Sequence, residues 1–141
     1  MRKLLIDTNV VLDIALNRKS FYPDAMSVFV LAEQNIITGY VSASAITDVF
    51  YIASKDLGKV GAREALKHLL HVFYPATVTG NDIYKALELG WDDFEDSVQF
   101  VVGEGFSIDY IVTRNPADFA SGSIPTITPK QLMRIITDIG E

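Results

Sequence analysis

The sequence contains no cysteine and no long apolar run, and both absences narrow the class of protein. Without cysteine, disulfide scaffolds and cysteine-based zinc sites are excluded, and the chain fits a reducing compartment. No apolar run is long enough to cross a membrane. The apolar run that follows two basic residues at the N-terminus, Leu4–Ile6, is too short for a signal peptide. We therefore expect a cytoplasmic protein with no membrane-spanning segment.

Basic residues are few relative to acidic ones. The chain has 12 Lys and Arg against 18 Asp and Glu, which gives a net charge of −6, and its pI is about 4.8. This balance argues against a protein that coats nucleic acid without specificity. A carboxylate cluster that holds a metal ion would, however, add to the negative count without repelling a phosphate once the metal is bound. The acidity therefore lowers the expectation of nucleic-acid binding and does not exclude it.

Apolar residues, by contrast, are abundant. They make up 49% of the 141 positions, which is enough for a sizeable core and too many for a disordered segment. The chain has no internal repeat, no low-complexity tract and no linker. Its length suits one compact domain, which we expect to span residues 1–141.

Short apolar strands alternate with helical patterns along the whole chain. The predicted strands cover residues 3–6, 36–41, 75–79, 109–112 and 124–127. The predicted helices cover about 10–16, 24–34, 44–58, 60–73, 81–89 and 93–105, and a last one begins at 129. This alternation indicates an α/β fold, with a mostly parallel sheet and helices on both of its faces. Right-handed crossovers then place the ends of the first and fourth strands on one rim.

The most distinctive stretch is Trp91–Val98, in which four of eight residues are acidic. It opens a helical apolar pattern, and Asp93 and Asp96, three residues apart, share a face of that helix. An N-terminal cap explains one or two acids, because carboxylates accept the free N–H groups and complement the helix dipole. Four acids repel one another, and a divalent cation is the simplest group that would hold them together.

Further acids lie at the ends of other predicted elements. Asp7 ends the first strand, Asp48 lies early in the helix after the second strand, and Asp118 follows the turn after the fourth. A parallel sheet brings such ends together, although Asp7 can also be a helix cap and Asp48 a surface residue. Oxygen ligands suit Mg²⁺ or Mn²⁺, ions that support phosphodiester chemistry. With Asp93 and Asp96, these acids form the candidate metal ligands.

Two weaker patterns lie in the predicted helix 60–73 and just before it. Lys59, Arg63 and Lys67 follow one another at intervals of four, forming the basic stripe, which could track phosphates or be a solvated face. His68 and His71 are three residues apart, but no third ligand is near them in the sequence. We interpret the two histidines as ordinary helix residues.

The motifs Leu5–Val10, Asp93–Asp96 and Ile111–Phe119 occur in the order and spacing of a known family. The chain resembles the PIN-domain family, in the VapC-like group and in the branch with a TRNxxDF ending. Each motif is weak alone, but together they are specific, and the resemblance covers essentially the whole chain. It implies a three-layer α/β/α sandwich and a metal-dependent endoribonuclease, often the toxin of a toxin–antitoxin pair. RNA is then the substrate, an antitoxin a possible partner, and a homodimer the expected assembly.

The resemblance also assigns site residues. Asp7 matches the first acid of the family and Asp96 the third, while Asp48 stands where the second acid, usually Glu, is found. Many relatives have an Asp where this chain has Asn115, and Asp118 is the nearest acid. Asn115 offers a carbonyl oxygen but no charge, so the chain departs from the family here in a way that affects the number of metal ions bound.

Three neighbouring residues have expected supporting roles. Thr113 and Asn9 resemble residues that orient an acid or the attacking water. Arg114 stabilises charge that develops on the phosphate, or it is a structural salt-bridge donor. In the implied reaction, a water molecule activated at the metal site attacks the scissile phosphorus.

Two other functional classes compete with the nuclease. A magnesium-dependent phosphatase or phosphoacceptor domain also places an Asp after the first strand, but here Thr8-Asn9-Val10 follows Asp7, with no second acid two residues on. A non-catalytic PIN-like module that binds RNA or protein is the other, favoured by the uncharged Asn115. Release of phosphate from a phosphomonoester would identify the phosphatase, and calorimetric metal binding would separate the nuclease from the non-catalytic module.

Overall fold

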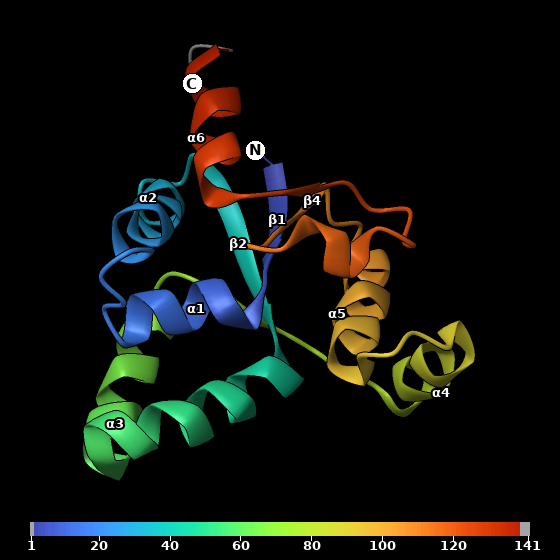
Figure 1. The fold of residues 1–141 in the computed structure, drawn as a ribbon, viewed down its shortest axis with the longest axis horizontal. Coiled ribbons are helices and arrows are strands. Elements are labelled where there is room, and N and C mark those ends of the chain that lie inside the picture. The colour runs from blue at the N-terminus through green and yellow to red at the C-terminus, as the bar shows by residue number, and fades with distance from the viewer. Residues whose placement is uncertain (1, 139–141) are drawn as a thin grey trace.

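The fold is built on five short parallel strands. A computed structural model describes residues 2–138. Its strands are β1 (Arg2–Ile6), β2 (Ile37–Ser42), β3 (Tyr74–Ala76), β4 (Tyr110–Val112) and β5 (Thr126–Ile127). They form one sheet in the order β3-β2-β1-β4-β5, and every neighbouring pair is parallel (Figure 1). The parallel sheet predicted from the alternating pattern is confirmed.

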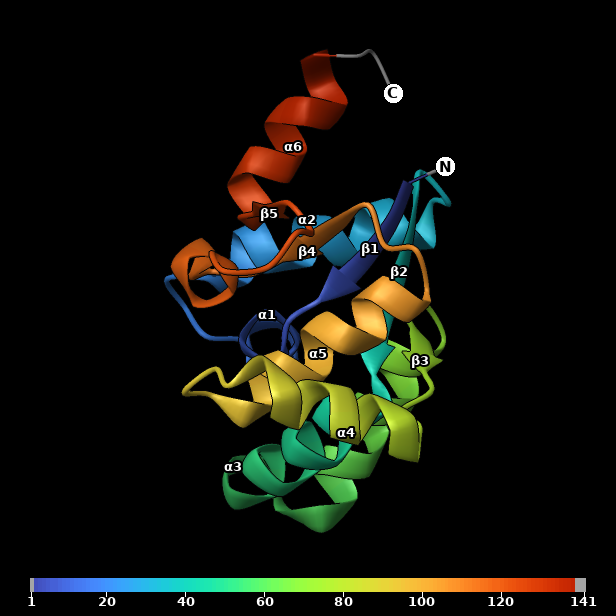
Figure 2. The ribbon, with the colours of Figure 1, turned by 90° about the vertical axis from the view of Figure 1, so that its right-hand side faces the viewer.

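Helices cover both faces of this sheet. They are α1 (Thr8–Ala15), α2 (Tyr22–Glu33), α3 (Ala43–Leu70), α4 (Gly80–Leu89), α5 (Phe94–Gly105) and α6 (Pro129–Asp138), with a short 3-10 helix, η1 (Pro116–Phe119). Helices α1 and α2 lie on one side of the sheet, and α4 and α5 lie on the other (Figures 1 and 2). The predicted α/β/α sandwich is therefore confirmed. No helix described within residues 2–138 has the length and apolar character needed to cross a membrane.

The central strand β1 explains the two layers of core. Leu4 and Ile6 are fully buried in one apolar cluster, which includes side chains of α1, α2 and α6. Leu5, whose side chain points to the opposite face, is fully buried in a second cluster with side chains of α5. Because β1 is apolar on both faces, it can occupy the middle of a sheet covered on both sides.

Helix α3 differs from the prediction of two separate helices over 44–58 and 60–73. It runs from Ala43 to Leu70 with a kink at Gly58, whose φ of 73° is not helical. Glycine adopts this left-handed conformation without the steric cost that other residues pay. The predicted stop near Gly58 is thus a change of direction, and the chain leaves the helix at Leu70 to enter β3.

The segment after β3 also differs from the prediction of a strand over 75–79. The strand covers only Tyr74–Ala76, and Thr79 instead caps α4. The Thr79 hydroxyl accepts the Asp82 backbone N–H at 3.1 Å, and the Asp82 carboxylate accepts the Thr79 N–H at 2.9 Å. This reciprocal capping box favours the start of a helix over continuation of the strand. The αL residue Gly90 ends α4, as predicted.

Candidate active site

Asp7 lies at the carboxyl end of β1, where the chain turns into α1. Its backbone N–H donates to the carbonyl of Val112 in β4 at 2.9 Å, so the two strands end side by side. One carboxylate oxygen, Oδ1, accepts the Thr8 backbone N–H at 2.7 Å and Nε2 of Gln99 at 2.9 Å. The other, Oδ2, accepts the Thr113 hydroxyl at 2.7 Å. Asp7 therefore caps α1 and is also held rigidly on the rim that the sequence predicted.

The surroundings of Asp7 change its pKa. Its side chain is only 4% exposed. Burial raises the pKa of Asp7, and the hydrogen bonds from Thr113, Gln99 and Thr8 offset part of that effect, while the charge of Asp118 adds to it. A carboxylate that is buried, oriented and close to another acid is a good candidate for a cation ligand.

Asp93 and Asp96 occupy the start of α5, as predicted. Oδ1 of Asp93 accepts the Asp96 backbone N–H at 3.1 Å, so Asp93 is the N-cap of the helix. Burial raises the pKa of Asp96 to about 7, and the neighbouring charges of Asp93, Asp7 and Asp118 contribute to that increase. The expected repulsion between converging acids is thus present, although burial contributes more to the raised pKa than any single neighbour.

Glu95 was not predicted as a site residue, yet it joins this cluster. Its Oε1 accepts the Thr8 hydroxyl at 2.7 Å and lies 3.5 Å from Nε2 of Gln99. The pKa of Glu95 is raised to about 7, mainly because the side chain is buried. A hydrogen bond with Asp48 also raises this pKa, whereas the hydrogen bond from the Thr8 hydroxyl lowers it. Asp48 of α3 is therefore brought to the site, as predicted, but as the partner of a second acid.

Gln99 is the other residue of this cluster that the sequence did not predict. It is fully buried, and its amide group donates to Asp7 while facing Glu95. One feature of the sequence could have indicated Gln99, because it is a polar residue inside the apolar run Val98–Val102. Such a residue marks a buried polar contact, but the sequence does not identify its partner.

The segment after β4 supplies the remaining predicted residues. The Thr113 hydroxyl, which donates to Asp7, also accepts the Asn115 backbone N–H at 3.1 Å. Asp118 lies in η1 and raises the pKa values of both Asp7 and Asp96. Asp96 and Asp118 both line an open pocket of about 390 Å³. Its lining residues are Gly90, Trp91, Asp92, Asp93, Asp96, Asp118 and Ser121.

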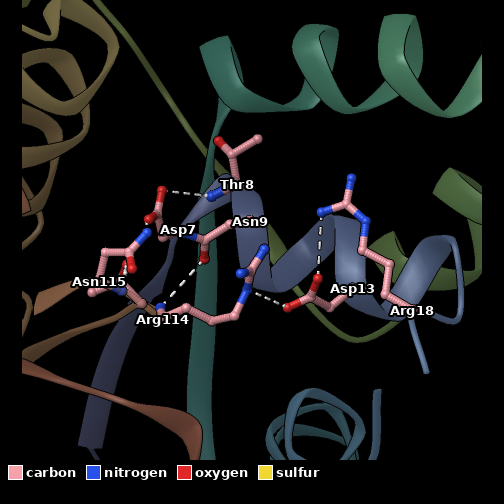
Figure 3. Close-up of polar contacts among 8 residues, drawn as sticks. Asp7, Thr8, Asn9, Asp13, Arg18, Arg114 and Asn115 are labelled. Carbon is pink, nitrogen blue, oxygen red and sulfur yellow. Dashed lines mark hydrogen bonds and ion pairs between the residues drawn. The ribbon is translucent and has the colours of Figure 1, made fainter. Parts of the chain in front are cut away.

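The structure shows which contacts Arg114 and Asn9 make. Nε of Arg114 lies 2.8 Å from Oδ2 of Asp13, so the structural salt bridge is the arrangement found (Figure 3). Oδ1 of Asn9 accepts the Arg114 backbone N–H at 3.4 Å. Asn9 thus contacts the segment after β4.

The basic stripe and His68 lie on the second half of α3, and His71 is the C-cap residue of this helix. Lys59, Arg63 and Lys67 are exposed, and Nζ of Lys67 lies 3.5 Å from a carboxylate oxygen of Glu64. The ring of His68 stacks on Phe29 with 5.3 Å between ring centroids. His68 is therefore an ordinary packing residue, in agreement with the sequence interpretation.

The chemistry of the acidic cluster fits a hard divalent cation. Its donors are all oxygens, and the raised pKa values of Asp7, Glu95 and Asp96 reflect buried negative charge that a cation would relieve. Within residues 2–138, however, no three Asp, Glu or His side chains are grouped as a ready-made metal site. The acids are therefore close enough for their charges to interact but do not form a complete set of ligands.

The raised pKa values lead to a prediction for the metal-free protein. The ordinary pKa values of Asp and Glu are 3.8 and 4.5, whereas Asp96 and Glu95 in the fold have pKa values of about 7. Between these limits the folded state holds more protons than the unfolded chain, so the free energy of unfolding falls as pH rises. We expect the melting temperature to drop by several degrees between about pH 5 and about pH 8. A melting temperature that is flat or rises across this window would contradict the burial of these acids.

Known proteins resemble this chain in sequence and in fold. Ribonuclease VapC1 of Aquifex aeolicus is 25% identical over 134 residues, which cover 92% of each chain. The VapC20 toxin of Mycobacterium tuberculosis, described as cleaving the sarcin-ricin loop, has a TM-score of 0.70 at 16% identity over 84% of this chain and 95% of that one.

A second solved structure is VapBC2 of Rickettsia felis, bound to a DNA fragment from its promoter. It has a TM-score of 0.68 at 15% identity, over 89% of this chain and 98% of that one. At these identities, the two structural matches establish a common fold. The family model described as PIN domain matches residues 3–117, and the chain therefore belongs to the PIN-domain family.

Proposed function

We propose that the protein is a metal-dependent endoribonuclease that hydrolyses phosphodiester bonds in RNA. The main support is that Asp96 and Asp118 lie close enough to Asp7, at the carboxyl end of β1, for their charges to interact, in a chain of the PIN-domain family. This rim is where open α/β sheets bind their ligands. The similarity to a ribonuclease over 92% of the chain adds to that support.

The proposed cofactor is Mg²⁺ or Mn²⁺. Asp7, Asp96 and Asp118 would hold it, with Asp48 as a further ligand and Asp93 close enough to contribute charge. When bound, such an ion supplies positive charge that polarises the phosphate and lowers the pKa of water. Asn115 would contribute an amide oxygen at most, so the protein-derived negative charge is one unit lower than with Asp at this position.

The residues of the chain have distinct tasks in this proposal. The three hydrogen bonds to Asp7 keep its carboxylate in one orientation, so that it need not reorganise during the reaction. A carboxylate of the acidic cluster would accept the proton that the attacking water loses. As the new P–O bond forms, the bond to the leaving oxygen breaks, and that oxygen takes up a proton.

One observation favours a second candidate. Asn115, two residues after Thr113, is neutral where many members of the family carry an Asp, which fits a non-catalytic module that binds RNA or protein. The test is incubation of the purified protein with mixed RNA in Mg²⁺ or Mn²⁺, with EDTA and with a phosphomonoester as controls. Cleavage that EDTA suppresses supports the nuclease. Intact RNA together with no calorimetric metal binding supports the non-catalytic module, and phosphomonoester hydrolysis alone supports a phosphatase.

We further propose a cytoplasmic protein that forms a homodimer and binds an antitoxin. Large apolar side chains remain exposed on α3 and α4, and they would be covered in such complexes. They include Tyr51, Val60, Tyr84 and Leu87, each at least 60% exposed. A solved structure from Klebsiella pneumoniae with this fold, at a TM-score of 0.65 and 22% identity, is described as a toxin–antitoxin complex. A monomeric mass in light scattering would contradict the homodimer.

A further inference from the structure

Asp13 is a buried acid that the proposed reaction does not use. It lies in α1 between Leu12 and Ile14, and it is only 1% exposed. Its two carboxylate oxygens face two different cations, because Nε of Arg114 is 2.8 Å from Oδ2 and Nη1 of Arg18 is 3.4 Å from Oδ1. Figure 3 shows Asp13 between the two guanidinium groups.

Arg114 is tied to the first helix and its following loop in three ways. Its guanidinium group pairs with Asp13 and lies over the ring of Phe21, 3.9 Å from the ring centroid. Its backbone N–H donates to Oδ1 of Asn9. Only 27% of the Arg114 side chain is exposed, so these contacts hold it in one place. Arg114 directly follows Thr113, the residue whose hydroxyl donates to Asp7.

We propose that Asp13 is a positioning residue for the candidate metal site, acting through Arg114. We call Asp13, Arg114 and Phe21 the α1 brace. Its function is to hold the segment 113–118 against α1, so that Thr113 and Asp118 keep a fixed position relative to Asp7. This inference rests on the proposed function, because it assigns a task in metal binding.

Two contacts make the brace effective. Helix α1 carries Asp7 at its N-cap and Asp13 in its last turns, so it is one rigid body with two attachment points. The segment 113–118 is attached to Asp7 through Thr113 and to Asp13 through Arg114. Other contacts also hold the segment, because the Thr113 N–H donates to the Ile127 carbonyl at 2.9 Å and the Pro116 carbonyl accepts the Thr126 hydroxyl at 3.5 Å. The brace therefore adds a second link between the start of the segment and α1. Asp118 lies at the end of this segment, in η1, where its backbone N–H donates to the Asn115 carbonyl at 3.0 Å.

The energetics also favour a positioning role over a purely stabilising one. A buried ion pair gains little over well-packed apolar residues of similar size, since the cost of desolvating both charges offsets their attraction. Nε of Arg114 and Oδ2 of Asp13 lie 2.8 Å apart without hydrogen-bond alignment, so the pair holds the guanidinium group close to α1 by charge attraction. An apolar pair in the same place would fill the space but would not fix the backbone of Arg114.

The test compares three variants of the full chain. Asp13→Asn breaks the brace, and the double variant Asp13→Leu with Arg114→Met removes both charges so that neither is left buried and unpaired. Arg18→Gln is the matched control, since it removes the longer ion pair on the same carboxylate without touching the segment 113–118. Each is measured by Mn²⁺ calorimetry, by amide hydrogen exchange at residues 113–118, and by thermal melting.

We expect Asp13→Asn and the double variant to bind Mn²⁺ about 10-fold more weakly, the size of effect seen when groups behind metal ligands are lost. Exchange at residues 113–118 should be at least about 10-fold faster in both. Arg18→Gln should match the wild type in both measurements. The double variant should melt closer to the wild type than Asp13→Asn does, because it leaves no buried unpaired charge. Its weakened Mn²⁺ binding would then not be a consequence of lost stability.

Unchanged exchange in Asp13→Asn would overturn the brace. If residues 113–118 exchange faster in Asp13→Asn but the variant binds Mn²⁺ with wild-type affinity, the brace is only a structural contact. That result would overturn the positioning role. Failure of the proposed function looks different, because the wild type itself would then bind no Mn²⁺ and cleave no RNA. In that case Asp13 has no metal site to position. The exchange rates at residues 113–118 would still show whether the brace holds the segment.

Discussion

The variant Asp96→Asn is expected to lose RNA cleavage while its metal-free form becomes more stable. The substitution keeps the size of the side chain but removes a charge that Asp93, Asp7 and Asp118 repel. Because the carboxylate is only partly buried, we expect the free energy of unfolding to rise by about 1 kcal/mol near pH 8, a few degrees in melting temperature. Cleavage should fall by about 10³-fold or more, since Asp96 is assigned as a ligand of the catalytic metal ion.

The measurement is a melting series of wild type and Asp96→Asn, with and without Mn²⁺, run beside cleavage of mixed RNA. Mn²⁺ should raise the melting temperature of the wild type and have little effect on the variant. Asp92→Asn is the matched control, because it removes one charge from an exposed neighbour in the same stretch. If Asp96 only served the start of α5, wild type and Asp96→Asn would respond to Mn²⁺ alike and cleave alike, which would exclude this site.

The variant Gln99→Glu is expected to show the largest loss of stability. The amide of Gln99 is fully buried and donates to Asp7 while facing Glu95. A carboxylate of the same shape would replace these N–H donors with a third acid between two others. We expect a loss of about 3–5 kcal/mol near pH 8, the cost typical of an uncompensated buried charge. Because burial raises the pKa of such a group, the loss should shrink as pH falls toward about 5.

Gln99→Met is the control that separates charge from hydrogen bonding. It has a similar size and no charge, and it removes the donor to Asp7, so we expect a smaller loss of about 1–3 kcal/mol. Its pH dependence should be no steeper than that of the wild type. Thermal melting of both variants near pH 5 and pH 8 provides the comparison. Equal losses for the two variants at both pH values would show that Gln99 does not face a cluster of acids.

Much of the fold could be read from local patterns. Apolar strands alternating with amphipathic helices predicted the parallel sheet, because a strand buried on both faces must have helices on both sides. The boundaries were less well determined around Gly58 and Thr79. At each, two conformations were locally acceptable, and either the kink in α3 or the capping box of α4 decided between them.

The sequence alone also identified the acids at strand and helix ends, Asp7, Asp96 and Asp118, since topology brings such ends to one rim. It did not predict that Glu95 and Gln99 lie in the acidic cluster, or that Asp13 pairs with the segment after β4. Gln99 and Asp13 are polar residues inside apolar helices, which marks burial but not the partner. Their partners, Asp7 for Gln99 and Arg114 for Asp13, lie 92 and 101 residues away in the chain. Only the packing of α5 and of the segment after β4 against α1 determines which groups meet, because hydrogen bonds and ion pairs depend on distances that local sequence patterns do not contain.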